Sequence, residues 1–121
     1  MPASAVVRLI DELTSGAAPG RRELSFTAMG GAYNRVPADE TAFVHRSERF
    51  LLEHIAHGGD QWLDRSWALA HALASGRVYP NFPDPDLDDW ATAYYGGNTE
   101  RLRAVKRGYD PERLFRFPQA I

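Results

Sequence analysis

Three prolines within ten residues constrain this chain more than any other feature of its sequence. The segment 77–86 reads RVYPNFPDPD, with prolines at positions 80, 83 and 85. Each proline fixes its own φ angle, lacks a backbone N–H and disfavours helix at the residue before it. The segment must therefore be extended, and it cannot lie centrally in a sheet along its whole length. We interpret it as an ordered connector between regular elements.

Helical spacing of apolar residues predicts helices on both sides of this connector. They are expected from Ser4 as N-cap to just before Gly16, over 61–75 between the N-cap Asp60 and the stop Gly76, over 90–95 after the cap Asp86, and from Asn98 or Thr99 onward. Asp110 and Pro111 have the N-cap and N1 pattern of one last helical turn, which ends near Phe115.

Strands are expected in the first half of the chain. Residues 24–29 alternate between apolar and small or polar side chains until Gly30 interrupts them. After the turn near Pro37, residues 41–45 and 49–54 are rich in aromatic, aliphatic and β-branched side chains, which suits two strands or one long bent strand. The stretch 48–55 also fits a helix, and the pattern alone leaves both assignments open.

Length and composition exclude several classes of protein. A chain of 121 residues has room for one domain and buries about two-thirds of its surface on folding. The absence of cysteine excludes disulfides and thiolate metal sites, and no apolar stretch is long enough to span a membrane. We therefore expect a cytoplasmic protein. The net charge of −2 argues against a nucleic-acid partner, so the six basic residues of 101–116 are interpreted as solvated helix faces.

The titratable residues offer one chemical candidate. The four histidines lack a carboxylate framework of metal-ligand spacing, and no metal site is expected. Tyr79 lies in the rigid connector, and rigidity is what a positioned general base or hydrogen-bond donor requires. A phenol acts as a base at neutral pH only if a positive charge or oriented donors stabilise the phenolate; Arg77 is one such charge. The alternative is an ordinary half-buried aromatic side chain.

Many positions of the final third resemble a known family. The segment 79–87, YPNFPDPDL, is followed by Asp89–Trp90, AYYG at 93–96, Asn98, Arg101–Leu102, YDP at 109–111 and LFRFPQ at 114–119. This run resembles the C-terminal signature of berberine-bridge-enzyme-like FAD-linked oxidases. The signature covers 77–121, and GGAYNR at 30–35 with TAFVHR at 41–46 extends the similarity over about 24–121.

The resemblance implies a fold and a site. It implies an α+β fold with a small antiparallel sheet packed against helices, in a single domain, 1–121, that is similar to the C-terminal part of the substrate domain of those oxidases. Tyr79 matches the tyrosine at the reactive face of the flavin, often proposed as a base. Asn81 matches a polar contact to the isoalloxazine, and Tyr95 and Asn98 lie in the motif that supports this pocket.

The family's flavin-holding elements have no counterpart here. Family members are several times longer, and their N-terminal half supplies a glycine-rich pyrophosphate loop and the histidine to which the flavin is bonded. A dinucleotide pyrophosphate needs clustered backbone donors. FAD is therefore the cofactor that the resemblance implies, and we expect this chain alone not to hold it tightly.

Three interpretations remain open. The chain is the C-terminal part of an FAD-linked oxidoreductase of secondary metabolism that works with a flavin-bearing partner. Alternatively, it is a flavin-independent protein that reuses the former substrate pocket of the oxidases. It then binds a small apolar molecule there or catalyses a non-redox reaction, cyclase-like or isomerase-like. The third is a fragment that folds without catalysis. Unpaired strand edges and an uncovered apolar face predict a partner chain, of which a homodimer is the simplest form.

Overall fold

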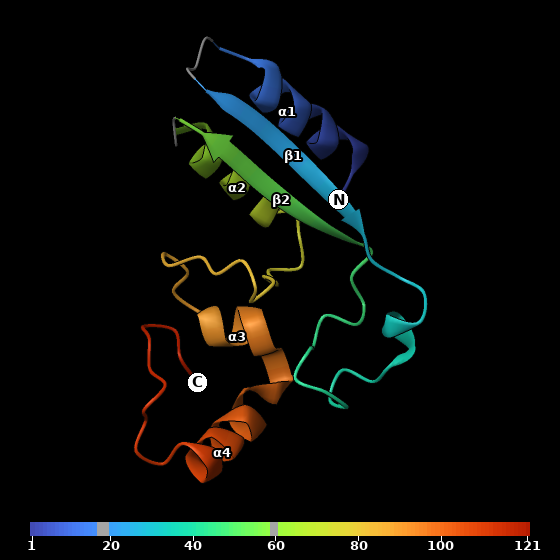
Figure 1. Ribbon diagram of the computed structural model, residues 1–121. Helices are drawn as coiled ribbons and strands as arrows, with labels where there is room; N and C mark the ends of the chain where they lie inside the picture. Colours follow the sequence, from blue (N-terminus) through green and yellow to red (C-terminus); the bar gives the residue numbers. More distant parts are fainter. Residues whose placement is uncertain (17–19, 59–60) are drawn as a thin grey trace. The chain divides into compact units, whose positions relative to one another are not determined.

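The computed structural model describes residues 1–16, 20–58 and 61–121, which form two compact units (Figure 1). Met1–Met29 and Arg49–Gly76 make up the first unit, and Gly30–Glu48 and Arg77–Ile121 the second. The chain has the predicted α+β fold, with an antiparallel pair of strands and α-helices. That residues 1–121 form a single domain stays a prediction.

The first unit places two helices on one face of a strand pair. Its elements are α1 (Ala3–Thr14), β1 (Arg21–Ala28), β2 (Phe50–His57) and α2 (Gln61–His71). The strands are antiparallel, with Arg21 opposite His57 and Ala28 opposite Phe50. Arg22 and His54 share a face because side chains alternate along each strand. Arg22 Nη1 donates to the Ser15 carbonyl beyond α1 at 2.8 Å, and His54 Nδ1 lies 2.9 Å from Ser66 Oγ on α2.

Small and aromatic side chains fill the core of the first unit. Its fully buried members are Leu9, Trp62 and Ser66, and Ala5 and Ala70 are nearly so. Arg22 lies over the Trp62 ring, 5.9 Å from the ring centroid. Because His54 is drawn into this core, burial lowers the pKa of its imidazole.

The second unit consists of short helices joined by long irregular segments. They are the 3₁₀ turn η1 (Tyr33–Arg35), α3 (Trp90–Tyr95), the 3₁₀ turn η2 (Gly96–Asn98) and α4 (Thr99–Tyr109). Its buried side chains are unusually polar: Val44, Ala93 and Tyr94 lie beside His45, Asn98, Asp110 and Gln119. Specific hydrogen bonds must therefore replace much of the apolar core.

The C-terminal segment is tied to the proline-rich connector. Tyr94 Oη accepts a hydrogen bond from the Asp84 N–H at 2.8 Å and donates to Gln119 Oε1 at 3.0 Å. Gln119 Nε2 in turn donates to the Asp84 carbonyl at 2.6 Å. This triangle ties the connector to the C-terminal segment.

The connector was expected to be extended, and that prediction is wrong at two turns. In these turns the Phe82 N–H donates to the Tyr79 carbonyl at 3.0 Å and the Leu87 N–H to the Asp84 carbonyl at 3.3 Å. Pro80 and Pro85 each stand at the second position of a turn, where the fixed φ of proline is favoured.

Residues 41–45 were expected in a strand, and that prediction is wrong. They are irregular because side chains, rather than a neighbouring strand, take up their polar groups. Arg46 donates from Nε to the Phe43 carbonyl at 3.0 Å and from Nη2 to Thr41 Oγ1 at 2.6 Å. Asn98 Nδ2 donates to the Thr41 carbonyl at 3.0 Å. The helical alternative for 48–55 is also excluded, since β2 occupies most of it.

Four helix boundaries also differ from expectation. The N-cap of α3 is Asp89, not Asp86. Pro2, not Ser4, is the N-cap of α1, and α2 ends at His71 because the following N–H groups form turns with the Ala70 and His71 carbonyls. The expected N-cap Asp60 lies outside the described residues. Residues 110–115 form a turn instead of helix, since the Asp110 carboxylate accepts the N–H groups of Leu114 and Phe115 at 2.7 and 3.1 Å.

Candidate functional site

Tyr79 and Asn81 form a direct pair on the proline-rich connector. Asn81 Nδ2 donates a hydrogen bond of 2.9 Å to Tyr79 Oη. The phenol is half-buried, whereas the Asn81 side chain is exposed. Pro80 and Pro83 restrict the backbone on either side of Asn81. The Tyr79 and Asn81 side chains are therefore held at a fixed distance and orientation. The phenol oxygen keeps its own O–H and one lone pair for a further partner.

Aromatic side chains surround the Tyr79 ring. Phe43 meets it edge to face with ring centroids 6.0 Å apart, and Phe82 does so at 5.8 Å. Phe43 also contacts Tyr33 at 5.9 Å and His45 at 5.2 Å. We call these five side chains, Tyr33, Phe43, His45, Tyr79 and Phe82, the aromatic cluster. Edge-to-face contacts of this kind are preferred geometries and fix the ring orientations.

Arg46 anchors the loop that carries Phe43. Its guanidinium donates to the carbonyls of Phe43 and Tyr33, each at 3.0 Å, and lies 4.8 Å from the centroid of the Phe43 ring. The arginine thus ties the backbone at Tyr33 to the backbone at Phe43, and its guanidinium lies over the Phe43 ring. Burial and Glu48 raise the pKa of the Tyr33 phenol, although Arg46 opposes the shift.

Arg77, the charge expected beside Tyr79, has a different partner. Its Nε lies 3.7 Å from Glu48 Oε1. A Cβ atom on Gly96, whose φ is +49°, would lie 2.8 Å from Arg77 Nη1 and 3.2 Å from Val44 Cγ2. The positive φ favours glycine at this position, and its missing side chain leaves space for the guanidinium. The donor that reaches the Tyr79 oxygen is the Asn81 amide, a contact that sequence reasoning did not predict.

Asn98 and Tyr95 are the other expected cofactor contacts. Neither forms a hydrogen bond with Tyr79 or Asn81 among the described residues. Asn98 is 6% exposed and donates from Nδ2 to the carbonyls of Ala38 and Thr41 at 2.7 and 3.0 Å. It joins the start of α4 to the loop before Phe43. Tyr95 is half-buried, and burial and Tyr94 raise the pKa of its phenol. That either residue contacts a cofactor stays a prediction.

His45 is a feature of the site that sequence reasoning undervalued. It is 3% exposed, and neither ring nitrogen has a hydrogen-bond partner among the described residues. Burial and Arg77 lower the pKa of its imidazole, whereas Glu48 and backbone groups at Val78 and Tyr94 oppose the shift. Only its position beside Phe43 in the sequence pointed to the aromatic cluster.

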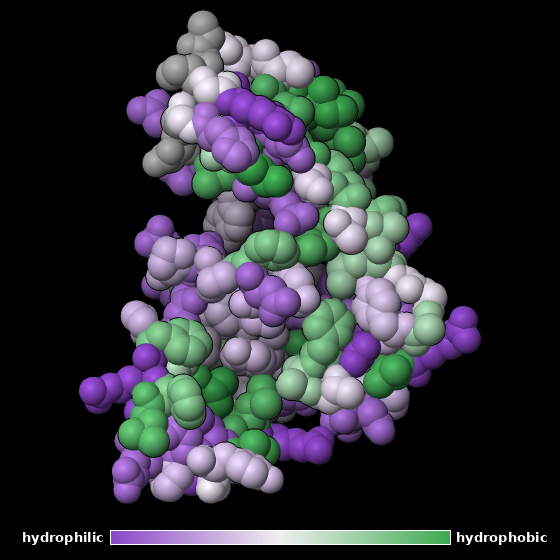
Figure 2. Space-filling model, in the orientation of Figure 1, coloured by the Kyte–Doolittle hydropathy of each residue, from purple (hydrophilic) through white to green (hydrophobic). Residues whose placement is uncertain are grey.

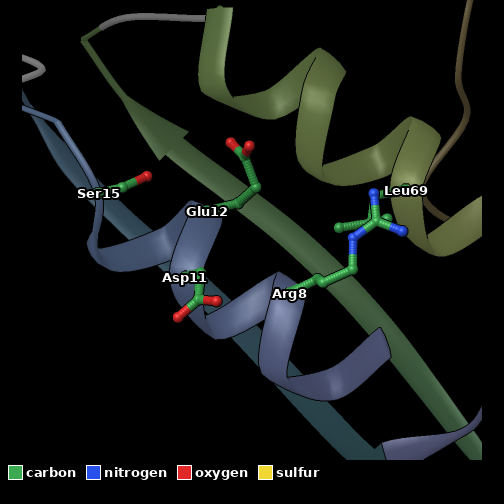
Figure 3. Close-up of a pocket in the computed structure, with 5 residues that line it drawn as sticks. All are labelled: Arg8, Asp11, Glu12, Ser15 and Leu69. Carbon is green, nitrogen blue, oxygen red and sulfur yellow. The ribbon is translucent and has the colours of Figure 1, made fainter. Parts of the chain in front are cut away.

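A surface pocket exists elsewhere, in the first unit. Figure 3 shows Arg8 of α1 reaching toward Leu69 of α2, with Asp11 and Glu12 farther along α1 and Ser15 beyond its end. Its volume is about 190 Å³, and it contains none of the expected site residues. Within the described ranges, no group of three His, Asp or Glu side chains is placed to hold a metal, and no helix is both long and apolar enough to cross a membrane.

The site fits one part of FAD better than another. Exposed Asn81, exposed Phe82 and the half-buried phenol of Tyr79 offer polar and aromatic edges that suit contact with a planar ring system. A pyrophosphate needs clustered N–H donors. The buried Asn98 amide at the start of α4 is already bonded to two carbonyls, so it is not one of them. These residues therefore suit the isoalloxazine, not the pyrophosphate.

Comparison with known proteins gives a consistent picture of the chain's relatives. Residues 78–121 match the family model described as "Berberine and berberine like". The chain is 39% identical over 107 residues to the uncharacterized FAD-linked oxidoreductase YvdP of Bacillus subtilis, covering 79% of this chain and 23% of that protein. It is 34% identical over 116 residues to chitooligosaccharide oxidase of Gibberella zeae, covering 81% and 23%.

A solved structure extends the similarity to the whole chain. A variant of Physcomitrella patens BBE-like 1 superposes with a TM-score of 0.84 and 27% identity, covering 100% of this chain and 27% of that one. The chain thus spans about a quarter of the length of the proteins it matches. The resemblance noted from residues 79–119 is confirmed.

Proposed function

From the premise that this chain belongs to the berberine bridge enzyme-like FAD-linked oxidoreductases, we propose that it is the C-terminal part of the substrate domain of such an enzyme. In this proposal, oxidation requires an FAD-binding segment that these 121 residues do not contain. Support comes from the Tyr79–Asn81 pair, which lies within the matched segment and presents a phenol at fixed orientation.

Tyr79 is the proposed catalytic residue. FAD, when bound, would supply the hydride acceptor for the oxidation of the substrate. The Tyr79 oxygen would take the accompanying proton of the substrate on its free lone pair as its own O–H proton passes to solvent, and the hydrogen bond from Asn81 holds that oxygen in place. Phe43 and Phe82 pack against the ring on other sides and offer an apolar wall for a small substrate. Asn81 contacts the isoalloxazine, and Asn98 and Tyr95 support the loop and helix behind it.

The partner surface is proposed to lie at the C-terminal end. Tyr109 is 90% exposed, Leu114 and Phe115 are each 76% exposed, and Phe117 is 64% exposed. Figure 2 shows apolar side chains at the surface in this region, at lower left. So much exposed apolar area favours contact with another protein surface. We propose the FAD-binding segment as its occupant; a homodimer at micromolar concentration, seen by sedimentation, is the competing outcome.

A chimera tests the function. This whole chain replaces the matching C-terminal segment of the Gibberella zeae chitooligosaccharide oxidase, and flavin absorbance and substrate-driven flavin reduction are measured. The expected result is a yellow protein in which Tyr79→Phe slows reduction by about 10²–10⁴-fold at unchanged flavin content. Tyr109→Phe is the matched control, because it removes an exposed phenol hydroxyl and keeps the ring that contributes to the proposed partner surface. Equal rates for the two variants contradict the role of Tyr79.

The chain alone tests the need for a second segment. FAD titrated into the purified chain should bind weakly, since the site suits only the ring of the cofactor. Tight binding that gives a yellow protein contradicts this part of the proposal. A colourless chain that retains a small apolar compound through purification favours a flavin-independent function instead.

A further inference from the structure

His45 is a buried base, one aromatic ring away from Tyr79, that faces backbone groups at Val78 and Tyr94 without a hydrogen bond of good geometry among the described residues. It is 3% exposed, and neither ring nitrogen is hydrogen-bonded within the described part of the chain. Buried polar groups are nearly always paired in folded proteins, so an imidazole in this state calls for an explanation. The proposed function does not use it.

Phe43 connects the two side chains mechanically. It meets His45 edge to face, with centroids 5.2 Å apart and planes at 83°, and meets Tyr79 at 6.0 Å, also at 83°. Its backbone carbonyl is held by Arg46, so the ring has little freedom to move independently of its loop. Because packed aromatic rings transmit displacement rather than absorb it, a movement of His45 is passed to Tyr79.

The charges that face His45 oppose one another. Arg77 and Glu48 act on the imidazole, and they lie 3.7 Å apart as an ion pair; the backbone at Val78 and Tyr94 faces it as well. A proton on His45 would put a second positive charge beside Arg77. The Glu48 carboxylate would then be the one negative charge near both the imidazolium and the guanidinium. The imidazolium must then compete for Glu48 or move toward water.

The guanidinium of Arg77 is crowded on one side, although its side chain is 37% exposed. Its Nη1 passes within 2.8 Å of where a Cβ on Gly96 would stand, with Val44 packed on the same point at 3.2 Å. Val44 is itself buried and precedes His45 in the chain. Val44 is thus held in place, whereas Phe43 on its other side is half-buried and can move when the imidazole gains a proton.

We propose that His45 is a positioning residue for Tyr79: neutral, it holds Phe43 against the Tyr79 ring, and protonated, it displaces Phe43 and releases the Tyr79–Asn81 pair. The site is thus intact at neutral pH and loosened in acid. The consequence for oxidation rests on the proposed function. The coupling itself does not, because it is a property of this chain.

Aromatic NMR of the purified chain tests the coupling as the pH falls below about 6.5, because burial lowers the pKa of His45 from that ordinary value. The Tyr79 ring signal, identified by its loss in Tyr79→Phe, should shift with the same midpoint as the His45 ring signals. In His45→Gln, which cannot take the proton, that shift should disappear. His71→Gln is the control: His71 stacks on Trp67 in the first unit, and its loss should leave the Tyr79 titration unchanged.

A second variant keeps the test decisive if His45→Gln does not fold. Glu48→Gln removes the negative charge that favours the imidazolium, so the midpoint of the Tyr79 shift should move to lower pH. An unmoved midpoint, or a Tyr79 signal that stays constant while His45 titrates, overturns the proposal. Failure of the chimera to depend on Tyr79 would refute the proposed function but leave this coupling standing, so the two failures are distinguishable.

Discussion

Asn81 donates a 2.9 Å hydrogen bond to the phenol oxygen of Tyr79, two residues earlier in the chain. Pro80 lies between them and Pro83 follows, so the backbone that carries both side chains is already restricted before the chain folds. A polar pair of this kind loses little conformational entropy on folding and keeps its geometry when a substrate or a second protein surface arrives.

Removing the Asn81 amide should slow the proposed oxidation modestly. Asn81→Ala leaves the phenol in place but takes away the donor that orients it. In the chimera with Tyr79 intact, we expect flavin reduction to slow about 5- to 15-fold, the equivalent of one hydrogen bond. An effect as large as that of Tyr79→Phe would mean that Asn81 acts directly on the substrate.

Asn98 should matter for stability. Asn98→Asp keeps the size of the side chain but replaces the donors to the Ala38 and Thr41 carbonyls with an acceptor, at a position that is 6% exposed. We expect a loss of about 1–3 kcal/mol in urea unfolding. The control Asn81→Ala, at an exposed site, should cost less than about 0.5 kcal/mol. If Asn98→Asp is as stable as that control, the hydrogen bonds from Asn98 to the Ala38 and Thr41 carbonyls contribute nothing to the free energy of unfolding.

Tyr94→Phe should destabilise the second unit by about 1–3 kcal/mol, because it leaves the Asp84 N–H and the Gln119 amide without their common partner. Thermal or urea unfolding measures this loss. Tyr109→Phe removes a phenol that is 90% exposed and should be neutral. Equal stability of the two variants would show that the connector is held by its prolines alone.

Acid should open the turn after α4. Lys106 and the N–H groups of Leu114 and Phe115 bond to the Asp110 carboxylate and hold its pKa below the usual range. A carboxyl with a lowered pKa in the folded chain stabilises it above its ordinary pKa, and this stabilisation is lost as the pH falls through the lowered value. Hydrogen exchange at the Leu114 amide should therefore accelerate in acid, relative to other protected amides.

Asp110→Asn serves as the control for that turn. The amide oxygen accepts at most weakly from the two N–H groups and does not titrate, so protection of Leu114 should be low at every pH. Retained protection that still falls in acid would assign the pH dependence to a group other than Asp110.

Local patterns predicted the regular elements better than they predicted the site. The spacing of apolar residues indicated α1, α2, α3 and α4 with ends displaced by at most four residues, and the alternation at 24–29 indicated β1. The predicted strand at 41–45 was wrong because its carbonyls and hydroxyl bond to Arg46 and Asn98, partners that lie outside the segment or far along the chain. A local propensity contains no information about such partners.

By itself, the sequence determined that residues 77–86 form neither helix nor strand, that helices and strands occur where apolar residues recur at their periods, and that Tyr79 and Asn81 lie on one stiff segment. Those properties follow from covalent geometry and from spacing within a few residues. The tertiary structure alone decided that Arg77 pairs with Glu48, that Phe43 bridges His45 and Tyr79, and that Asn98 holds a loop some sixty residues away. These contacts join distant parts of the chain, and only the packed fold establishes which side chains meet.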